Sequence, residues 1–247
     1  MTGWAGSADR VVLDEVDSTN AEAQRRAAQV HGPLWIAARR QSAGRGRSGR
    51  QWLSPEGNLA ATLLLRRDEP PAEKARLSFH AALAVAELVE RLAPGAPVAL
   101  KWPNDVLLAG AKVSGILLES FATPAPGANL AIGIGVNLAH FPPPEQTRWP
   151  ATSVAAALGR VPPVEEALGL LADRMAHWLA IDAARGFAPV REAWLARAGH
   201  LGRRIEARLA SETVAGIFED VTADGALILA TTSGRRVITA ADIHFPA

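Results

Sequence analysis

The segment Gln41-Ser-Ala-Gly-Arg-Gly-Arg-Ser-Gly-Arg-Gln-Trp52 lies between two apolar segments of strand length, residues 34–38 and 59–65. It combines three glycines with three arginines. Glycine lets successive backbone N–H groups turn inward, and arginine guanidinium groups match carboxylate or phosphate oxygens bidentately. The pattern therefore predicts an anion-binding loop, here named the basic loop (residues 41–52), that rises from the edge of a sheet.

The basic loop also satisfies the G-x-G-x-x-G pattern of dinucleotide-binding turns, through Gly44, Gly46 and Gly49. That turn needs a helix starting at its last glycine, whereas turn-forming residues follow here up to Pro55 and Gly57. The sequence also lacks the Gly-Lys-Ser/Thr of a Walker A loop. We reject both motifs, which leaves a flexible basic surface loop as the alternative explanation of the segment taken alone.

Composition excludes several classes of protein. A chain of 247 residues with 49% hydrophobic content can fill one large domain and a small one. It has no apolar run of membrane-spanning length and no leader-like N-terminus, so we expect a cytoplasmic protein that does not cross a membrane. Zero cysteines and the absence of an H-x-x-x-H pattern argue against disulfides and a zinc site.

Apolar periodicity predicts strands and helices along most of the chain. The clearest helix covers residues 72–93, where apolar residues recur at helical spacing before Pro94-Gly95. Further strands are predicted over residues 11–16, 98–102, 106–109, 113–118 and 129–137, and further helices over residues 21–28, 152–158, 164–181 and 189–197.

The pattern changes near residue 199. Short alternating segments follow, separated by the turn sequences Asp224-Gly225 and Ser233-Gly234. Several short strands with tight turns in such a short stretch predict a small barrel. We therefore expect two domains, residues 1–198 and residues 199–247.

Two polar features stand outside the basic loop. Residues 17–20 (Asp-Ser-Thr-Asn) precede a predicted helix, where Thr19 with Glu22 fits a capping box, and their side chains would also serve a polar ligand. Lysine occurs at only three positions, two of which, Lys101 and Lys112, lie in one short segment. In a chain that otherwise uses arginine, a compact ammonium group is a hint of function.

Five segments resemble, in order and spacing, the motifs of the biotin protein ligases: residues 17–20, 41–52, 101–105 (Lys-Trp-Pro-Asn-Asp), 112–117 and 133–137. The resemblance implies an α/β catalytic domain with a mixed sheet, followed by an SH3-like β-barrel. It also implies that biotin and Mg-ATP give biotinyl-5′-adenylate and pyrophosphate. The biotinyl group would then pass to a lysine of the biotin carboxyl carrier domain of a carboxylase.

The resemblance assigns roles to individual residues. Lys112 would contact the biotin carboxyl group and the α-phosphate, Arg47 would help to retain the adenylate, Trp52 would pack against the adenine, and Asp105 would border the Mg2+ region. Fixed cations suit this chemistry, because it brings two anions together. The residues expected to bind biotin or the adenylate are Ser18, Thr19, Asn20, Gln41, Gly44, Arg45, Gly46, Arg47, Arg50, Trp52, Asn104, Lys112, Gly115 and Asn137.

Two other classes stay open. A lipoate or octanoate ligase or transferase of related fold would also use a lysine near the acyl group, although the basic loop and residues 101–105 favour biotin. A nucleic-acid-binding protein would explain the arginines but neither Lys112 nor residues 17–20.

A role in repression is not expected. Many bacterial biotin ligases carry an N-terminal winged-helix domain, whereas the catalytic pattern here starts by about Val11 and the formal net charge is only +1. We therefore expect no specific DNA binding. The oligomeric state varies within the family, so a homodimer remains an open alternative to a monomer.

Overall fold

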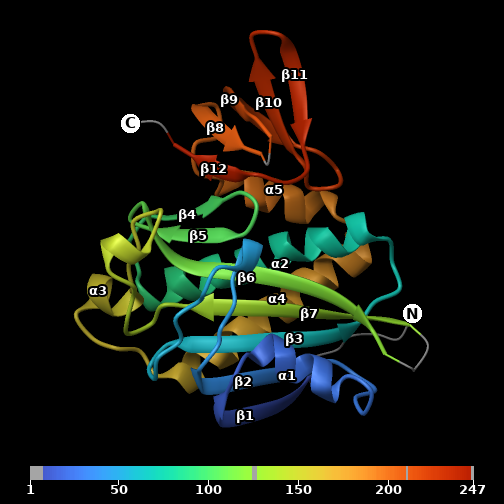
Figure 1. The fold of residues 1–247 in the computed structure, drawn as a ribbon, viewed down its shortest axis with the longest axis vertical. Coiled ribbons are helices and arrows are strands. Elements are labelled where there is room, and N and C mark those ends of the chain that lie inside the picture. Colours follow the sequence, from blue (N-terminus) through green and yellow to red (C-terminus); the bar gives the residue numbers. More distant parts are fainter. Residues whose placement is uncertain (1–7, 124–126, 210, 246–247) are drawn as a thin grey trace.

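A seven-stranded mixed sheet forms the centre of the larger domain (Figure 1). The computed structural model describes residues 8–123, 127–209 and 211–245. The strand order is β1-β2-β3-β7-β6-β5-β4, in which β1 and β2 are parallel and the other neighbours are antiparallel. The predicted mixed-sheet α/β fold is confirmed. The strands are β1 (Asp9–Val16), β2 (Leu34–Gln41), β3 (Leu59–Arg66), β4 (Val98–Lys101), β5 (Asp105–Leu108), β6 (Ala111–Ala122) and β7 (Ala128–Val136).

Helices cover both faces of this sheet. Alternate residues of a strand point to opposite faces, and in β2 the side chains of Trp35 and Ala37 belong to the large core cluster that includes α2. Leu34 and Ile36 instead pack with helix α1 on the other face. In the described part of the chain, no helix is long and apolar enough to cross a membrane. The helices are α1 (Thr19–Arg26), α2 (Pro71–Leu92), α3 (Val154–Leu158), α4 (Val164–Arg185) and α5 (Ala188–Ala196).

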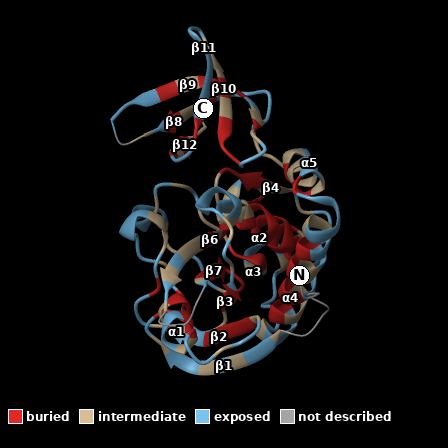
Figure 2. Ribbon diagram, turned by 90° about the vertical axis from the view of Figure 1, so that its right-hand side faces the viewer, coloured by how far each residue is buried: buried red, intermediate tan, exposed pale blue. Residues whose placement is uncertain are grey.

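The middle of helix α2 is enclosed by the rest of the protein. Residues 79–86 are all buried, and the helix contacts strands β4 to β7 on one side and helices α4 and α5 on the other (Figure 2). Alanine at four of these positions lets its neighbours approach closely. Pro71 suits the first helical turn, where no intrahelical partner for its missing N–H is needed.

The C-terminal strands form a second, antiparallel sheet that stands at one end of the first (Figure 1). Its order is β11-β10-β9-β8-β12, so β11 and β12 are its edges. Two hydrogen bonds tie the second sheet to the rest of the chain. Trp102, which follows β4, donates its indole N–H to the Gly225 carbonyl at 2.9 Å, and Arg191 of α5 donates to the Val221 carbonyl at 2.7 Å. The strands are β8 (Arg204–Arg208), β9 (Thr213–Val221), β10 (Leu227–Thr231), β11 (Gly234–Ile238) and β12 (Asp242–His244).

The start of helix α1 differs from the predicted capping box. The N-cap residue is Ser18, whose side chain makes no capping hydrogen bond, and Thr19 is already helical. The Thr19 hydroxyl donates to Gln41 Oε1 at 3.1 Å, while Glu22 pairs with Arg25 and Arg26 at 2.6 Å. The capping-box prediction was wrong, because both side chains have better partners outside the helix backbone.

A fully buried imidazole links α2 to α4. His80 Nε2 donates to Asp182 Oδ2 at 2.9 Å, and Nδ1 lies 3.0 Å from the Arg76 carbonyl oxygen. The hydrogen bond from His80 holds the pKa of the Asp182 carboxyl group below its usual value. Because the carboxylate is the form that accepts this bond, its ionisation stabilises the packing of the two helices.

Asp182→Asn is expected to lower the free energy of unfolding at pH 7 by about 1.5–3 kcal/mol, the usual contribution of a hydrogen bond to a charged group. The lower pKa belongs to the folded state. The contribution is therefore present above the unfolded pKa of about 4 and is lost as the pH falls through the folded pKa. Urea denaturation at a series of pH values measures both effects.

Asp173→Asn is the matched control for this measurement, since Asp173 is an exposed carboxylate on the same helix. It should leave the free energy of unfolding within about 0.5 kcal/mol of wild type. A difference between wild type and Asp182→Asn that stays constant down to pH 2 would contradict the assignment.

Candidate functional site

One cavity of about 660 Å³ is lined by the basic loop, the glycine-bearing parts of β6 and β7, and strand β12. All but one of the predicted site residues line it. Residues far apart in the sequence therefore share a single site. The predicted residues in the lining are Ser18, Thr19, Asn20, Gln41, Arg45, Gly46, Arg47, Arg50, Trp52, Asn104, Asp105, Lys112, Gly115 and Asn137.

Gly44 is the predicted residue that does not line the cavity. It is buried at the base of the basic loop, where its carbonyl accepts the Trp52 N–H at 2.9 Å. A Cβ atom at this position would lie 2.4 Å from the Trp52 carbonyl oxygen. Gly44 therefore allows two parts of the loop to approach closely.

The floor of the cavity is a pair of facing glycines under an indole ring. Gly115 of β6 and Gly135 of β7 are register partners. A Cβ atom would lie 3.1 Å from the Trp52 ring at Gly115 and only 2.2 Å from Trp52 Nε1 at Gly135. Trp52 therefore rests directly on the sheet, with the Lys112 ammonium 5.5 Å from its ring centroid.

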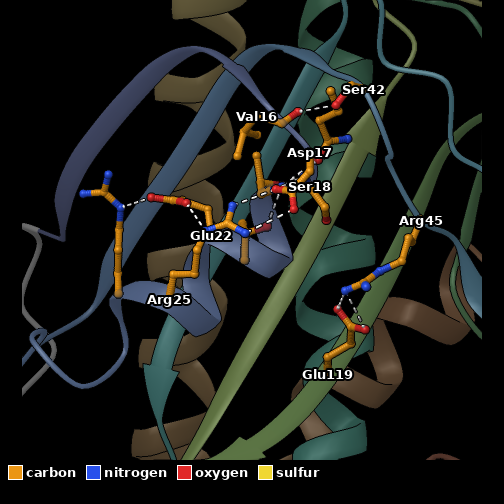
Figure 3. A network of polar contacts seen from close by, with 12 residues as sticks. Val16, Asp17, Ser18, Glu22, Arg25, Ser42, Arg45 and Glu119 are labelled. Carbon is orange, nitrogen blue, oxygen red and sulfur yellow. Dashed lines mark hydrogen bonds and ion pairs between the residues drawn. The ribbon is translucent and has the colours of Figure 1, made fainter.

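Figure 3 shows the polar groups at the start of α1. The Asp17 carboxylate binds Arg25 through two hydrogen bonds of 2.7 and 3.1 Å, which lower the pKa of Asp17 to about 2. The buried Ser18 hydroxyl lines the cavity and has no hydrogen-bond partner among the described residues. Ser18 can therefore donate to, or accept from, a bound molecule.

The neighbouring polar side chains are fixed by bonds within the protein. Asn20 Nδ2 donates to Glu119 Oε2 at 2.7 Å, and Asn20 Oδ1 accepts from the Thr62 hydroxyl at 2.7 Å. Gln41 Oε1 accepts from the Thr19 backbone N–H at 2.8 Å. This network holds the wall of the cavity rigid without a ligand.

Each arginine of the basic loop contacts a different element. Arg45 lies 3.3 Å from Glu119 of β6, and Arg47 donates to Asn104 Oδ1 at 3.2 Å (Figure 3 shows the first pair). Arg50 forms an ion pair with Asp242 of β12. Burial lowers the pKa of the Arg47 guanidinium group, which indicates a largely desolvated cation in the cavity wall.

Two lysines share the carboxylate of Asp105. Lys112 Nζ lies 2.6 Å from Oδ1, and Lys101 Nζ lies 3.6 Å from Oδ2. Burial is the main cause of the lowered pKa of Lys101. Among the described residues, no group of three or more His, Cys, Asp or Glu side chains could hold a metal ion. A divalent ion here would rely on Asp105 together with oxygens of a bound molecule.

Sequence reasoning gave no site role to several polar or aromatic residues of the cavity, among them Lys101, Arg148, Trp149 and Asp242. The scarcity of lysine was a usable signal for Lys101. Arg148 and Trp149 lie in a proline-rich loop, and Asp242 lies in the short strand β12, whose position was not predicted. No local pattern distinguishes these three, because only the fold brings them to the cavity.

Cations dominate the cavity. Among the described residues, its lining includes six lysine or arginine side chains (Arg45, Arg47, Arg50, Lys101, Lys112, Arg148) and two carboxylates (Asp105, Asp242). Such a site attracts anions and can stabilise negative charge that develops during a reaction.

The fold and this cavity define an anion-binding α/β catalytic domain followed by a small β domain. Residues 12–137 match the model of the biotin/lipoate A/B protein ligase family, and residues 200–245 match the biotin protein ligase C-terminal domain. This chain belongs to the biotin protein ligases of that family.

Relatives support the assignment over most of the chain. A biotin–[acetyl-CoA-carboxylase] ligase of Paracoccus denitrificans is 48% identical, with 95% of this chain and 99% of that protein aligned. The bifunctional ligase/repressor BirA of Bacillus subtilis is 34% identical over 85% of this chain and 65% of its own length. The structure of biotin protein ligase from Aquifex aeolicus in complex with biotin and ATP has a TM-score of 0.81 and 28% identity, covering 96% of this chain and 97% of that one.

Gly135→Ala is expected to displace the Trp52 indole from the sheet, since the new Cβ atom would overlap Nε1. The measurement is the fluorescence of Trp52, taken as the difference between each protein and its Trp52→Phe counterpart. Gly169→Ala on helix α4 is the control, because nothing lies within 4 Å of its Cβ position. The Gly169→Ala control should leave the Trp52 signal as it is in wild type. A wild-type Trp52 signal in Gly135→Ala would show that the indole does not rest on Gly135.

Proposed function

We propose that this protein activates biotin with ATP to biotinyl-5′-AMP and pyrophosphate, and then transfers the biotinyl group to a lysine of a biotin carboxyl carrier domain. The main structural support is the meeting of Lys112 and the basic-loop arginines at one cavity. The 48% identity to a biotin–[acetyl-CoA-carboxylase] ligase supports the choice of substrates and of a carboxylase as acceptor.

The first step joins two anions. A biotin carboxylate oxygen attacks the α-phosphorus of ATP, and the bond to the pyrophosphate oxygen breaks. Lys112 would contact both the carboxylate and the α-phosphate, while Arg47 would stabilise the negative charge that grows on the phosphoryl oxygens. Because Asp105 and Asn104 hold these two side chains before substrate arrives, little reorganisation is required.

The buried polar groups at the start of α1 are the proposed site for the biotin head. Its ureido group needs both donors and acceptors, and the Ser18 hydroxyl is able to serve as either. Thr19, Asn20 and Gln41 would shape this end through the bonds that already fix them. The adenine would pack against Trp52, which offers an aromatic face.

Mg2+ is part of the proposal. Asp105 and triphosphate oxygens would hold the ion, which would offset charge on the leaving pyrophosphate, and one carboxylate with phosphates is a usual set of ligands for it. Since both Asp105 oxygens already face ammonium groups, most of the coordination would come from ATP and water. A cytoplasmic location also belongs to the proposal, because the reaction consumes ATP.

In the second step the adenylate has to survive until the acceptor lysine arrives, since a mixed anhydride reacts with water. The basic loop, fastened to Glu119, Asn104 and Asp242, would cover it. We place the domain boundary between residues 198 and 199, and we propose that the C-terminal domain closes one side of the site through Asp242.

The reaction is tested by biotin-dependent exchange of labelled pyrophosphate into ATP. Exchange with biotin and not with lipoate is the expected result. Exchange only with lipoate or octanoate would instead support the related acyl ligases, and no exchange with any of these acids would refute an adenylating function.

Lys112→Ala is expected to lower the rate of biotinyl-adenylate formation by about a hundredfold or more, the scale of losing one preorganised charge-stabilising donor. Lys74→Ala is the control, since Lys74 does not line this cavity. Pyrophosphate exchange measures both, with melting temperature as a check on folding. Unchanged turnover in Lys112→Ala would remove Lys112 from the catalytic residues.

Arg47→Gly is expected to release the adenylate. Losing a charge-assisted contact of about 1.5–3 kcal/mol weakens retention about ten- to a hundredfold. The escaped anhydride would biotinylate lysines of a bystander protein such as albumin, detected by streptavidin blot. Labelling confined to the carrier domain would show that Arg47 does not retain the intermediate.

A further inference from the structure

The tip of the β4–β5 hairpin is held by a hydrogen bond to the C-terminal domain. The two strands pair up to Lys101 and Asp105, so residues 102–104 form the turn between them. Trp102 is 3% exposed, and its indole N–H donates to the Gly225 carbonyl at 2.9 Å. Because β4 is the last strand of its sheet, strand pairing holds this hairpin mainly from the β6 side.

The turn that accepts this hydrogen bond is itself well fixed. Within residues 222–226, here named the bracket turn, the Thr222 hydroxyl accepts from the backbone N–H groups of Asp224 and Ala226 at 3.2 and 3.1 Å. The Asp224 carboxylate also pairs with Arg76 of helix α2 at 2.6 Å. The bracket turn is therefore tied both internally and to the catalytic domain.

Gly225 brings the bracket turn directly against helix α2. Its φ is +81°, in the left-handed region that favours glycine. A Cβ atom here would lie 2.7 Å from the ring of Phe79, which is buried in the middle of α2. The core of the catalytic domain therefore sets the position of the Gly225 carbonyl, and Trp102 is fastened to that position.

Two residues of the same hairpin hold cations of the site. Asn104 Oδ1 accepts from Arg47 at 3.2 Å, and Asp105 Oδ1 lies 2.6 Å from Lys112 Nζ. Only one residue separates Trp102 from Asn104. A shift of the indole would therefore move both acceptors, and with them the cations that they hold.

We propose that Trp102 is a positioning residue, through which the C-terminal domain sets the placement of Arg47 and Lys112 for adenylate formation. This inference rests on the proposed function, because it gives the second domain a part in that reaction. Trp102 takes no part in bond making; it keeps the two cations where charge develops on the phosphoryl oxygens. Misplacing such groups by about 1 Å lowers a rate about a hundredfold, even when the change lies away from the reacting atoms.

Trp102→Phe tests this, since phenylalanine keeps an aromatic ring and removes the N–H donor. The kcat of biotin-dependent pyrophosphate exchange should fall about ten- to a hundredfold. Because Arg47 is also the proposed retaining group, biotinyl-5′-AMP should escape, and the ratio of albumin labelling to carrier-domain labelling should rise about tenfold or more. This ratio does not depend on the folded fraction, so a purely structural loss would leave it unchanged.

Gly225→Ala reaches the same contact from outside the cavity. The new Cβ atom would overlap Phe79 and displace the bracket turn, and Gly225 does not line the cavity. Gly225→Ala should therefore reproduce both changes without altering a side chain that faces a substrate. If Trp102→Phe does not fold, Gly225→Ala decides the question by the same two measurements.

Arg191→Met is the matched control. Arg191 of α5 donates to the Val221 carbonyl at 2.7 Å, so it anchors the same domain, and it does not line the cavity. Its loss loosens the contact between the domains without touching the hairpin. Both kcat and the labelling ratio should therefore stay within about twofold of wild type.

A wild-type kcat or a wild-type labelling ratio in Trp102→Phe or Gly225→Ala would overturn the proposal. Equal changes in Arg191→Met would also overturn it, because the effect would then come from loosened docking of the domain in general. A wild-type protein without pyrophosphate exchange refutes the proposed function itself, whereas an active wild type with unaffected variants refutes this inference alone.

Discussion

Repulsion among the cationic side chains of one cavity is the constraint on which the rest of the structure depends. Three arginines of a glycine-rich loop line the same cavity as two lysines that share the Asp105 carboxylate. Gathering like charges around one cavity is unfavourable, particularly away from water. Carboxylates from separate elements offset the repulsion, with Glu119 on β6 facing Arg45 and Asp242 on β12 facing Arg50. The cavity can therefore exist without ligand and still attract anions.

The central sheet fixes the positions of these charged side chains. Neighbouring strands β6 and β7 carry the facing glycines that support Trp52, and β5 and β6 carry Asp105 and Lys112. Behind them, helix α2 is buried along its middle turns and keeps the strands in place (Figure 2). A site built on packed elements can hold donors where charge develops in a transition state, which loops alone do less well.

The C-terminal domain contributes to the same cavity. Asp242 comes from its last strand, and Trp102 of the catalytic domain donates a hydrogen bond to Gly225. Because residues 241–244 line the cavity together with residues 18–20, the site is completed by residues from distant parts of the chain. The small β domain therefore acts as part of the active-site enclosure in the proposed reaction, and not simply as an appendage.

Local sequence determined the strands on both sides of the basic loop, helix α2, the anion-binding character of the loop and the resemblance to biotin ligases. These depend on periodicity, on turn chemistry and on spacing within short segments. Tertiary structure alone decided the partners of the charges. Arg50 and its partner Asp242 are 192 residues apart in the sequence. Thr19 donates a hydrogen bond to Gln41 instead of capping helix α1 as predicted. The same holds for Trp149 beside Lys101 and for Gly44 beneath the loop instead of in the cavity. Such contacts depend on how distant strands pack. A local sequence pattern reports the periodicity of one segment, and it carries no information about which remote residues that segment contacts after folding.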